Sequence, residues 1–265
     1  MTTVSHILNY LQTLAPPSMA ESWDHVGLNC GHLGKEVRTL LVALDPFAAV
    51  CQEAADLHAD LLVTHHALLW NPGFIADADA QGKNTLFLIE HGIAHINAHT
   101  NLDYAPGGVN DVLARRLGLQ SVEVLDPKGI DGQGQPWGLV RLGTVPPQPL
   151  TEFLCGVQQR LGCPGLRYTE AAPTVHRVAV GGGACGSELY AVAKAGCDTF
   201  VTSDIKYNQF WDAQELGLNL IDAGHFYTEN PVCAMLAQKI QSAFPEIQVH
   251  LSGKHRDYMK FFKKS

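Results

Sequence analysis

The 265-residue sequence has no long apolar run, no paired cysteine motif and no surplus of positive charge. No window approaches the roughly 20 apolar residues that a membrane-spanning helix needs. The segment Met1–Asp24 lacks the cationic stretch followed by an apolar run that marks a signal peptide. The seven cysteines are odd in number and include no C-x-x-C pair. We therefore expect a cytoplasmic protein with reduced cysteines and no membrane partner.

The charge balance argues against a nucleic-acid partner. The formal net charge is -8, from 18 Lys and Arg against 26 Asp and Glu. An acidic protein gains no general attraction to the phosphate backbone. The basic stretch Lys254–Ser265 is short and is interpreted as a solvated chain end. With 46% hydrophobic residues, the chain has the composition of a globular protein with a sizeable core.

Two stretches of the sequence alternate between strand and helix patterns. The first is expected to contain the strands Val37–Asp45, Asp60–Thr64 and Ile93–His99, the helices Phe47–His58, Thr85–His91 and Val109–Leu117, and the loop Leu68–Gly82. The second is expected to contain the strands Arg177–Val180, Asp198–Thr202 and Leu218–Ala223 and the helices Glu188–Ala195 and Pro231–Ile240. Such alternation predicts mostly parallel sheets covered by helices.

The two stretches also resemble each other. DLLVT and DTFVT are matching strands, and a His with an acid four residues later follows each third strand: His99 with Asp103, and His225 with Glu229. This pattern favours an internal duplication over convergence of similar units. The predicted fold class is α/β, with two similar α/β units. Their expected bounds are residues 1–125 and 173–265, and residues 126–172 form a small α+β connecting element containing the helix Leu150–Leu161.

Polar side chains follow three of the predicted strands. His65 and His66 come directly after DLLVT, Asp103 follows the next strand, and His225 and Glu229 follow the third strand of the second unit. The carboxyl-terminal edge of a parallel sheet is where open α/β folds place ligands. Adjacent residues on an extended chain point to opposite sides, so His65 and His66 are expected to serve different ions.

These residues point to metal binding more strongly together than alone. A strand-end His pair, a turn Asp and a capping Glu are each common for structural reasons. Imidazole and carboxylate without thiolate suit Zn, Fe, Mn, Ni or Co. Five ligands for two divalent ions leave open positions, as in catalytic sites. A carboxylate has two oxygens, so Glu229 is the expected bridge, and Glu229 with a metal-bound water is the favoured catalytic group.

Two further features take a secondary place in the prediction. His99 is either a residue that donates a hydrogen bond to a ligand carboxylate and orients it, or a core histidine, and Asp24 lies in the segment ESWDHVGL. The run Gly181–Gly183 could cradle a phosphate but lacks the Lys-Ser/Thr of a P-loop. A tight strand-to-helix turn is the better interpretation of this run.

Four motifs together resemble a known family. ESWDHVGL, LLVTHH, INAHTNLDYAPGGVND and DAGHFYTE look like the Nif-three-like dinuclear metal proteins, which are often labelled GTP cyclohydrolase 1 type 2. The resemblance runs from Glu21 to Glu229 and into the closing helix. It implies that His65, His66, Asp103, His225 and Glu229 bind two metal ions. It also implies two α/β domains and a ring-shaped homohexamer with the sites facing an internal cavity.

The family label implies hydrolytic opening of a guanine ring, although no residue pattern here specifies a guanine pocket. The expected function is a metal-dependent hydrolase acting on a nucleotide or a related small molecule. The alternative is a non-enzymatic metal-binding, metal-delivery or regulatory protein. Two positions depart from the family pattern: His25 replaces an Asn after W-D, and Asn208 replaces a His after Tyr. Neither is a ligand position, so they bear on substrate handling.

Overall fold

The computed structural model describes residues 1–70 and 74–262. Its contacts divide the chain into two units. The first contains residues 1–105 and 232–256, and the second contains residues 106–231 and 257–265. Within the described part of the chain, no helix has the length and apolar character needed to cross a bilayer. The predicted α/β class is confirmed.

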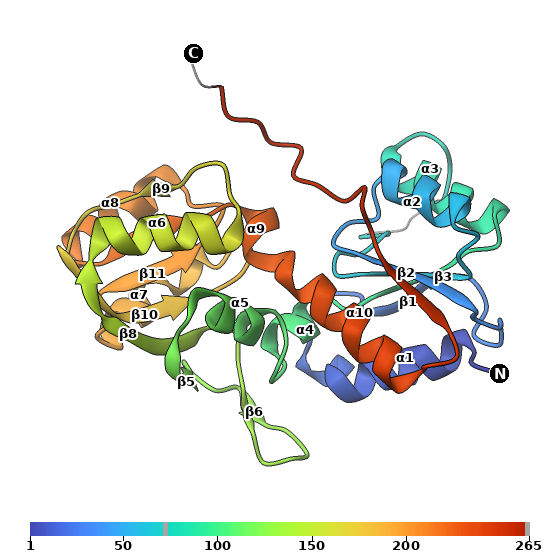
Figure 1. Cartoon of the computed structure of the whole chain (residues 1–265), viewed down its shortest axis with the longest axis horizontal. Helices are drawn as coiled ribbons and strands as arrows, with labels where there is room; N and C mark the ends of the chain where they lie inside the picture. Colours follow the sequence, from blue (N-terminus) through green and yellow to red (C-terminus); the bar gives the residue numbers. More distant parts are fainter. Residues whose placement is uncertain (71–73, 263–265) are drawn as a thin grey trace. The chain divides into compact units, whose positions relative to one another are not determined.

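The first unit is built on a five-stranded sheet in the order β1-β4-β3-β2-β13. Three of its four pairings are parallel, and β1 lies antiparallel on β4 at one edge. In Figure 1, α2 and α3 lie on one face of this sheet and α1 and α10 on the other. The strands are β1 (Gly27–Cys30), β2 (Thr39–Ala43), β3 (Leu61–Thr64), β4 (Ala94–Asn97) and β13 (Gln248–Leu251). The helices are α1 (Val4–Leu14), η1 (Pro17–Met19), α2 (Ala48–Asp56), α3 (Ala80–Glu90), α4 (Thr100–Tyr104) and α10 (Pro231–Ala243), the last belonging to this unit from Val232 onward.

The second unit is built on a six-stranded sheet in the order β5-β8-β10-β11-β12-β9. Its centre, β10-β11-β12, is parallel, and the three outer pairings are antiparallel. The strands are β5 (Gln120–Val124), β8 (Arg141–Pro149), β9 (Arg167–Tyr168), β10 (Thr174–Val180), β11 (Thr199–Thr202) and β12 (Asn219–Asp222), with a separate hairpin β6 (Gly129–Ile130) and β7 (Pro136–Trp137). The helices are α5 (Val109–Leu117), α6 (Leu150–Leu161), η2 (Gly186–Glu188), α7 (Leu189–Lys194), α8 (Tyr207–Glu215) and α9 (His225–Glu229).

Successive side chains of the central strands in the second unit point to opposite faces of the sheet and so contribute to two hydrophobic cores. Val178, Val180 and Val201 pack with α5 and α6 on one face. Ala179 and Phe200 pack with α7 and α8 on the other. Because successive strand residues point to opposite faces, a run of apolar residues can fill both cores. The continuous apolar pattern that predicted these strands therefore has a direct physical cause.

The bounds of the units differ from those expected. Residues 126–172, expected to be a separate connecting element, supply β8, α6 and β9 to the second unit. Most of α10 and all of β13 return to the first unit, where β13 pairs with β2. The sequence predicted the central strands of both sheets, but it did not predict the edge strands β1, β5 and β13 or the sheets that they join. Part of the expected loop Leu68–Gly82, residues 71–73, lies outside the described residues, as do residues 263–265 of the basic tail.

The parallel cores of the two units share a hydrogen-bond pattern. The Asp60 carboxylate Oδ2 accepts from the backbone N–H groups of Arg38 and Thr39, at 2.8 and 3.2 Å. The Asp198 Oδ2 accepts from the backbone N–H groups of His176 and Arg177, at 2.9 and 2.7 Å. In both units an aspartate directly before the middle strand therefore binds the neighbouring strand next to the point where their parallel pairing begins. This equivalence fits the predicted similarity of the two units.

Candidate metal centre

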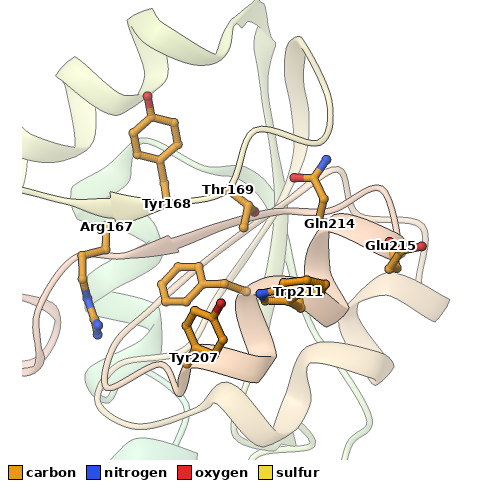
Figure 2. Close-up of a pocket in the computed structure, with 8 residues that line it drawn as sticks. Arg167, Tyr168, Thr169, Tyr207, Trp211, Gln214 and Glu215 are labelled. Atoms are coloured by element: carbon orange, nitrogen blue, oxygen red, sulfur yellow. The ribbon is translucent and has the colours of Figure 1, made fainter.

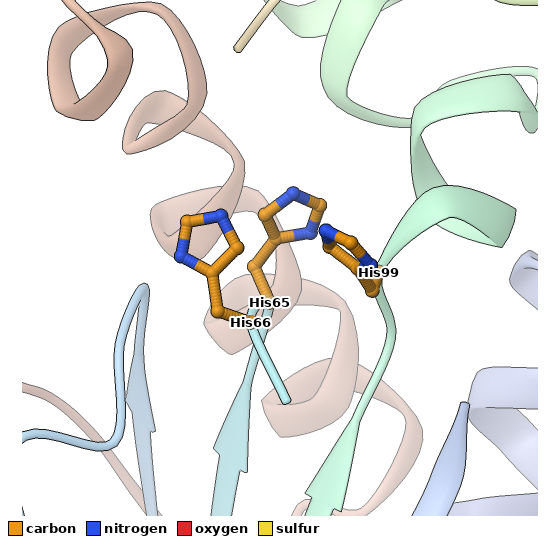
Figure 3. A group of neighbouring side chains, drawn as sticks. All are labelled: His65, His66 and His99. Atoms are coloured by element: carbon orange, nitrogen blue, oxygen red, sulfur yellow. The ribbon is translucent and has the colours of Figure 1, made fainter. Parts of the chain in front are cut away.

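Three histidines gather at the carboxyl ends of β3 and β4 in the first unit (Figure 3). His65 and His66 follow β3 directly, and His99 precedes α4 as its N-cap residue. The ring centroids lie 4.9 Å apart for His65 and His66, 5.2 Å for His65 and His99, and 5.5 Å for His66 and His99. One nitrogen from each ring lies within 4.8 Å of the others, close enough for all three to share one ion.

This proximity bears on the prediction that His65 and His66 serve different ions. Their rings are tilted by 44° and do not point to opposite sides of the chain. β3 has ended at Thr64, so the alternation of an extended strand no longer governs the next two residues. The geometry permits one shared ion as well as two separate ones.

Each of the three rings is oriented by an acceptor that binds its Nδ1. His65 Nδ1 donates to the Ala98 carbonyl at 2.8 Å, and His66 Nδ1 donates to Asp45 Oδ1 at 2.6 Å. His99 Nδ1 donates to Asp24 Oδ2 at 3.0 Å. A carbonyl or an ionised carboxylate can only accept, so Nδ1 carries the proton in each ring. In the neutral imidazole the lone pair is then on Nε2, which is the arrangement a metal-binding histidine requires.

Asp24 remains ionised as far as strongly acidic pH. Burial alone would raise the pKa of its carboxyl group, but hydrogen bonds from His99 and Thr100 outweigh burial and lower the pKa to about 2. The same carboxylate accepts from the Thr100 backbone N–H at 3.0 Å. Asp24 therefore ties the start of α4 to the segment before β1. This fixes the His99 ring through a permanent negative charge.

Asp103 completes the candidate ligands of the first unit. It lies in the short helix α4 and is buried, with 7% of its surface exposed. Its Oδ1 is 3.5 Å from His65 Nε2, the nitrogen that holds the lone pair. Carboxylate and imidazole thus converge on the same side of His65. This unit contains at least one three-histidine cluster with an adjacent buried carboxylate.

The second unit places a histidine and a glutamate on one turn of helix. Gly224, with a φ of +85°, allows the sharp turn from β12 into α9. His225 Nε2 and Glu229 Oε2, four residues apart on α9, are 2.9 Å apart. His225 Nδ1 donates to Asp204 Oδ2 at 2.7 Å. The pairing pattern of the first unit therefore recurs here.

The electrostatics of the second unit favour a cation beside His225. Burial on its own lowers the pKa of this imidazole, but the hydrogen bonds and charges of Asp204 and Glu229 outweigh burial and raise the pKa to about 11. The two carboxylates thus stabilise positive charge between His225 Nε2 and Glu229. A proton or a metal ion can supply that charge, so the residues suit a divalent cation in competition with protons.

The glycine turn Gly181–Gly183 supports Glu229 and does not present a phosphate cradle. The N–H groups of Gly181, Gly182 and Gly183 donate to the Val201 carbonyl, Asn110 Oδ1 and Thr228 Oγ1. These donors are directed inward, in agreement with the expected strand-to-helix turn. A Cβ on Gly183 would lie 2.1 Å from Glu229 Oε1. The glycine is therefore required for the carboxylate to occupy its position.

Comparison with known proteins places the chain in a family. The model of the Duf34/NIF3 (NGG1p interacting factor 3) family matches residues 2–257. The chain belongs to the Duf34/NIF3 family.

Several relatives match across nearly their full length. A protein of Nostoc sp. described as a GTP cyclohydrolase 1 type 2 homolog is 36% identical over 98% of this chain and 99% of its own length. A Clostridium perfringens protein of the same description is 30% identical over 97% of this chain and 99% of its own. A Bacillus cereus protein related to NIF3 has a crystal structure that matches with a TM-score of 0.92. It is 26% identical and covers 98% of this chain and 99% of that one.

Within this Duf34/NIF3 chain, the structure places the five predicted ligands in two groups. His65, His66 and Asp103 lie in the first unit, and His225 and Glu229 lie in the second. The secondary candidates His99 and Asp24 form a hydrogen-bonded pair beside the first group.

Two orienting carboxylates were missed in the sequence, Asp45 and Asp204. Each lies two residues after the end of an observed strand, β2 or β11, although Asp45 was expected to be the last residue of its strand. That position was the available signal, but a lone Asp after a strand is also a common turn residue. The two departures from the family pattern, His25 and Asn208, both have exposed side chains.

Proposed function

We propose that His65, His66, Asp103, His225 and Glu229 hold two divalent metal ions in one centre, and that the protein is a metal-dependent hydrolase acting on a nucleotide or a related small molecule. The observation that carries the proposal is the shared orientation of the histidines. All three predicted histidine ligands donate Nδ1–H to a fixed acceptor, which leaves Nε2 as the nitrogen that a metal ion would bind in place of a proton. Metal-binding histidines in proteins have this outer partner almost without exception.

Chain connectivity supports assigning both groups to a common centre. Asp103 lies three residues before Pro106, where the chain enters the second unit, and Glu229 lies three residues before Val232, where it returns to the first. Three residues span at most about 11 Å when fully extended. Each of the two acidic residues is therefore within about 11 Å of the residue at which the chain passes into the other unit.

The chemistry proposed for the site divides between the ions and the protein. When bound, divalent ions would polarise a substrate oxygen and lower the pKa of a water molecule. The protein's part is to hold and orient the ligands. Asp45 and Asp204 fix the rings of His66 and His225, and the Glu229 carboxylate, with Oε2 2.9 Å from His225 Nε2, would share a cation with that ring. The descriptions of the relatives as GTP cyclohydrolase 1 type 2 homologs suggest a purine nucleotide as the substrate class.

Metal content is the direct test of the centre. Protein purified without chelator and saturated with Zn, Mn or Fe should contain about two ions per chain by elemental analysis. This follows because five nitrogen and oxygen ligands exceed what one ion with an open position needs. A ratio that stays at or below one after saturation would contradict the two-metal proposal. The three-histidine cluster of the first unit would then be the simpler site.

Glu229→Gln tests the bridging role of Glu229, and turnover by the wild type separates a hydrolase from a metal-storage or metal-delivery protein. The change keeps the volume of the side chain but removes its charge, so both ions should bind more weakly and any hydrolytic turnover should be lost. His66→Ala should weaken mainly one ion, because an imidazole serves a single metal. We would measure the metal stoichiometry of both variants, check their fold by circular dichroism, and screen nucleotides for turnover. If Glu229→Gln still binds two metal ions per chain at full occupancy, Glu229 does not bridge the two ions. Two bound ions in the wild type without turnover of any nucleotide would favour the non-enzymatic alternative.

A further inference from the structure

A second feature of the second unit lies outside the metal ligands. Between α8 and β9 is a cavity of about 570 Å³ (Figure 2), within the size range of small-molecule sites. We call it the aromatic slot. It is lined by Tyr168 and Thr169 from the end of β9 and by Tyr207, Phe210, Trp211 and Gln214 from α8. The α8 residues follow the spacing i, i+3, i+4, i+7, so they share one face of the helix.

Three of the aromatic side chains that line the slot are far more exposed to solvent than aromatic residues packed in a core. Tyr207 is 78% exposed, Trp211 63% and Tyr168 46%. Only Phe210 packs against the core beneath. Exposing three large apolar rings to water on one surface is unfavourable, and such exposed clusters are typical of binding sites. Because each ring keeps a face accessible, the slot suits a flat aromatic ligand that stacks.

Polar groups around the slot specify what kind of ring it suits. Gln214 and Glu215 follow the aromatic residues on α8 and also line the cavity. A carboxylate accepts two hydrogen bonds side by side, and the guanine edge offers two adjacent N–H donors, whereas adenine offers one donor beside an acceptor. Gln214 can donate or accept. The set of Glu215, Gln214 and three aromatic rings therefore matches guanine better than adenine.

Arg167 connects the slot to the metal-binding half of the unit. It lines the slot, and it also lines a second cavity of about 280 Å³ together with Asp204 and Asp222. Asp204 is the acceptor for His225 Nδ1. The guanidinium is held in place by an ion pair with Asp222 and lies 5.5 Å from the centre of the Phe210 ring. Arg167 therefore borders both the slot and the cavity that contains Asp204, the carboxylate that orients His225.

We propose that the aromatic slot binds the purine ring of the substrate, with guanine preferred and with Glu215 reading its donor edge. The inference deepens the proposed function, and it rests on that function only in assigning the bound ring to the substrate. Trp211 and Tyr168 are the stacking residues, and Glu215 is the specificity residue. None of them is among the proposed metal ligands.

The test uses neutral nucleosides, which carry no phosphate to bind a metal. Isothermal titration of the metal-loaded, full-length protein with guanosine, adenosine and ribose should show saturable binding of guanosine, weaker binding of adenosine and none of ribose. Trp211→Ala and Tyr168→Ala should each weaken guanosine binding at least tenfold. Tyr190→Ala is the matched control, because Tyr190 is an equally exposed aromatic residue of the same unit outside the slot. Glu215→Gln should weaken guanosine at least tenfold and leave adenosine unchanged.

The outcomes distinguish this inference from the proposed function. The proposal that the slot binds guanine would be contradicted if guanosine did not bind, or if it bound equally well to Trp211→Ala and to the wild type. A change of assembly mass in the slot variants by light scattering would also contradict it, because the rings would then belong to a contact between copies of the chain. Guanosine binding that survives removal of the metal supports the slot even where elemental analysis finds fewer than two ions per chain.

Discussion

Gly183→Ala tests the placement of Glu229 without changing any predicted ligand. Gly183 has a φ of +65°, and a Cβ there would meet Glu229 Oε1 at 2.1 Å and His225 Nε2 at 3.3 Å. Real Cβ contacts are essentially never shorter than 3.0 Å, so the carboxylate has to move by about 0.9 Å. Metal–ligand distances tolerate only about 0.2 Å. We therefore expect a loss of metal affinity of at least tenfold.

The same change also carries a backbone cost that a matched variant can isolate. An alanine in the left-handed region costs about 1–2 kcal/mol of stability. Gly196 has a φ of +76° and no atom within 4 Å of its would-be Cβ. Gly196→Ala should therefore reproduce the backbone cost alone. Urea unfolding should give similar losses for the two variants, whereas competition with a chromophoric chelator should show weakened metal binding only in Gly183→Ala.

The comparison refutes the reasoning if Gly183→Ala keeps wild-type metal affinity and loses no more stability than Gly196→Ala. Glu229 would then be able to move aside without consequence, and it could not be a ligand held in place by the glycine turn. A stability loss well beyond that of Gly196→Ala, with intact metal affinity, would instead show that the turn serves packing alone.

Two further predictions concern assembly and pH. The resemblance to the family leads us to propose a homohexamer, so light scattering at micromolar protein should give about six times the chain mass of 28.7 kDa, and a clean monomer would contradict it. His95, fully buried and bonded through Nε2 to Thr64 Oγ1 at 2.7 Å, has its pKa lowered by burial to about 3. Its folded-state pKa lies below the unfolded value near 6.5, so the stability it contributes is present above pH 6.5 and is lost as pH falls toward 3, by about 1.4 kcal/mol per pH unit. Urea unfolding at pH 7 and pH 5.5 should show about 1 kcal/mol more loss in the wild type than in His95→Asn, and parallel losses would mean that His95 is not held neutral.

The helices that the sequence predicted best have an amphipathic pattern and a defined end. α5 and α6 have the predicted bounds, and each ends at a glycine in the left-handed region, Gly118 and Gly162. α8 was not predicted, because its side chains are largely exposed and only Ala213 is buried. Tyr207, Phe210 and Trp211 follow helical spacing, but only Phe210 of the three packs against the core, and this short pattern was not interpreted as a helix.

The candidate site was predictable where its residues follow strands and not where they meet across strands. His65, His66 and Asp103 could be assigned from their positions after strands, because parallel strands end at one edge. The pairing of His66 with Asp45 joins residues that follow different strands, and Asp24 reaches His99 from a segment 75 residues earlier. Such pairs depend on sheet order and loop path. A single sequence does not contain that information in readable form.

The two units show how one scaffold supports two different sets of candidate ligands. Asp60 and Asp198 anchor equivalent strands in the same way, and the following strands LLVT and TFVT both end at a threonine. The next two residues are His65 and His66 in the first unit but Ser203 and Asp204 in the second. The position that holds an imidazole in one unit therefore holds, in the other, the carboxylate that orients an imidazole. Exchanging an imidazole for a carboxylate at a fixed strand end leaves the hydrogen bonds of the scaffold unchanged, so the polar side chains at this position can differ while the fold of each unit is preserved.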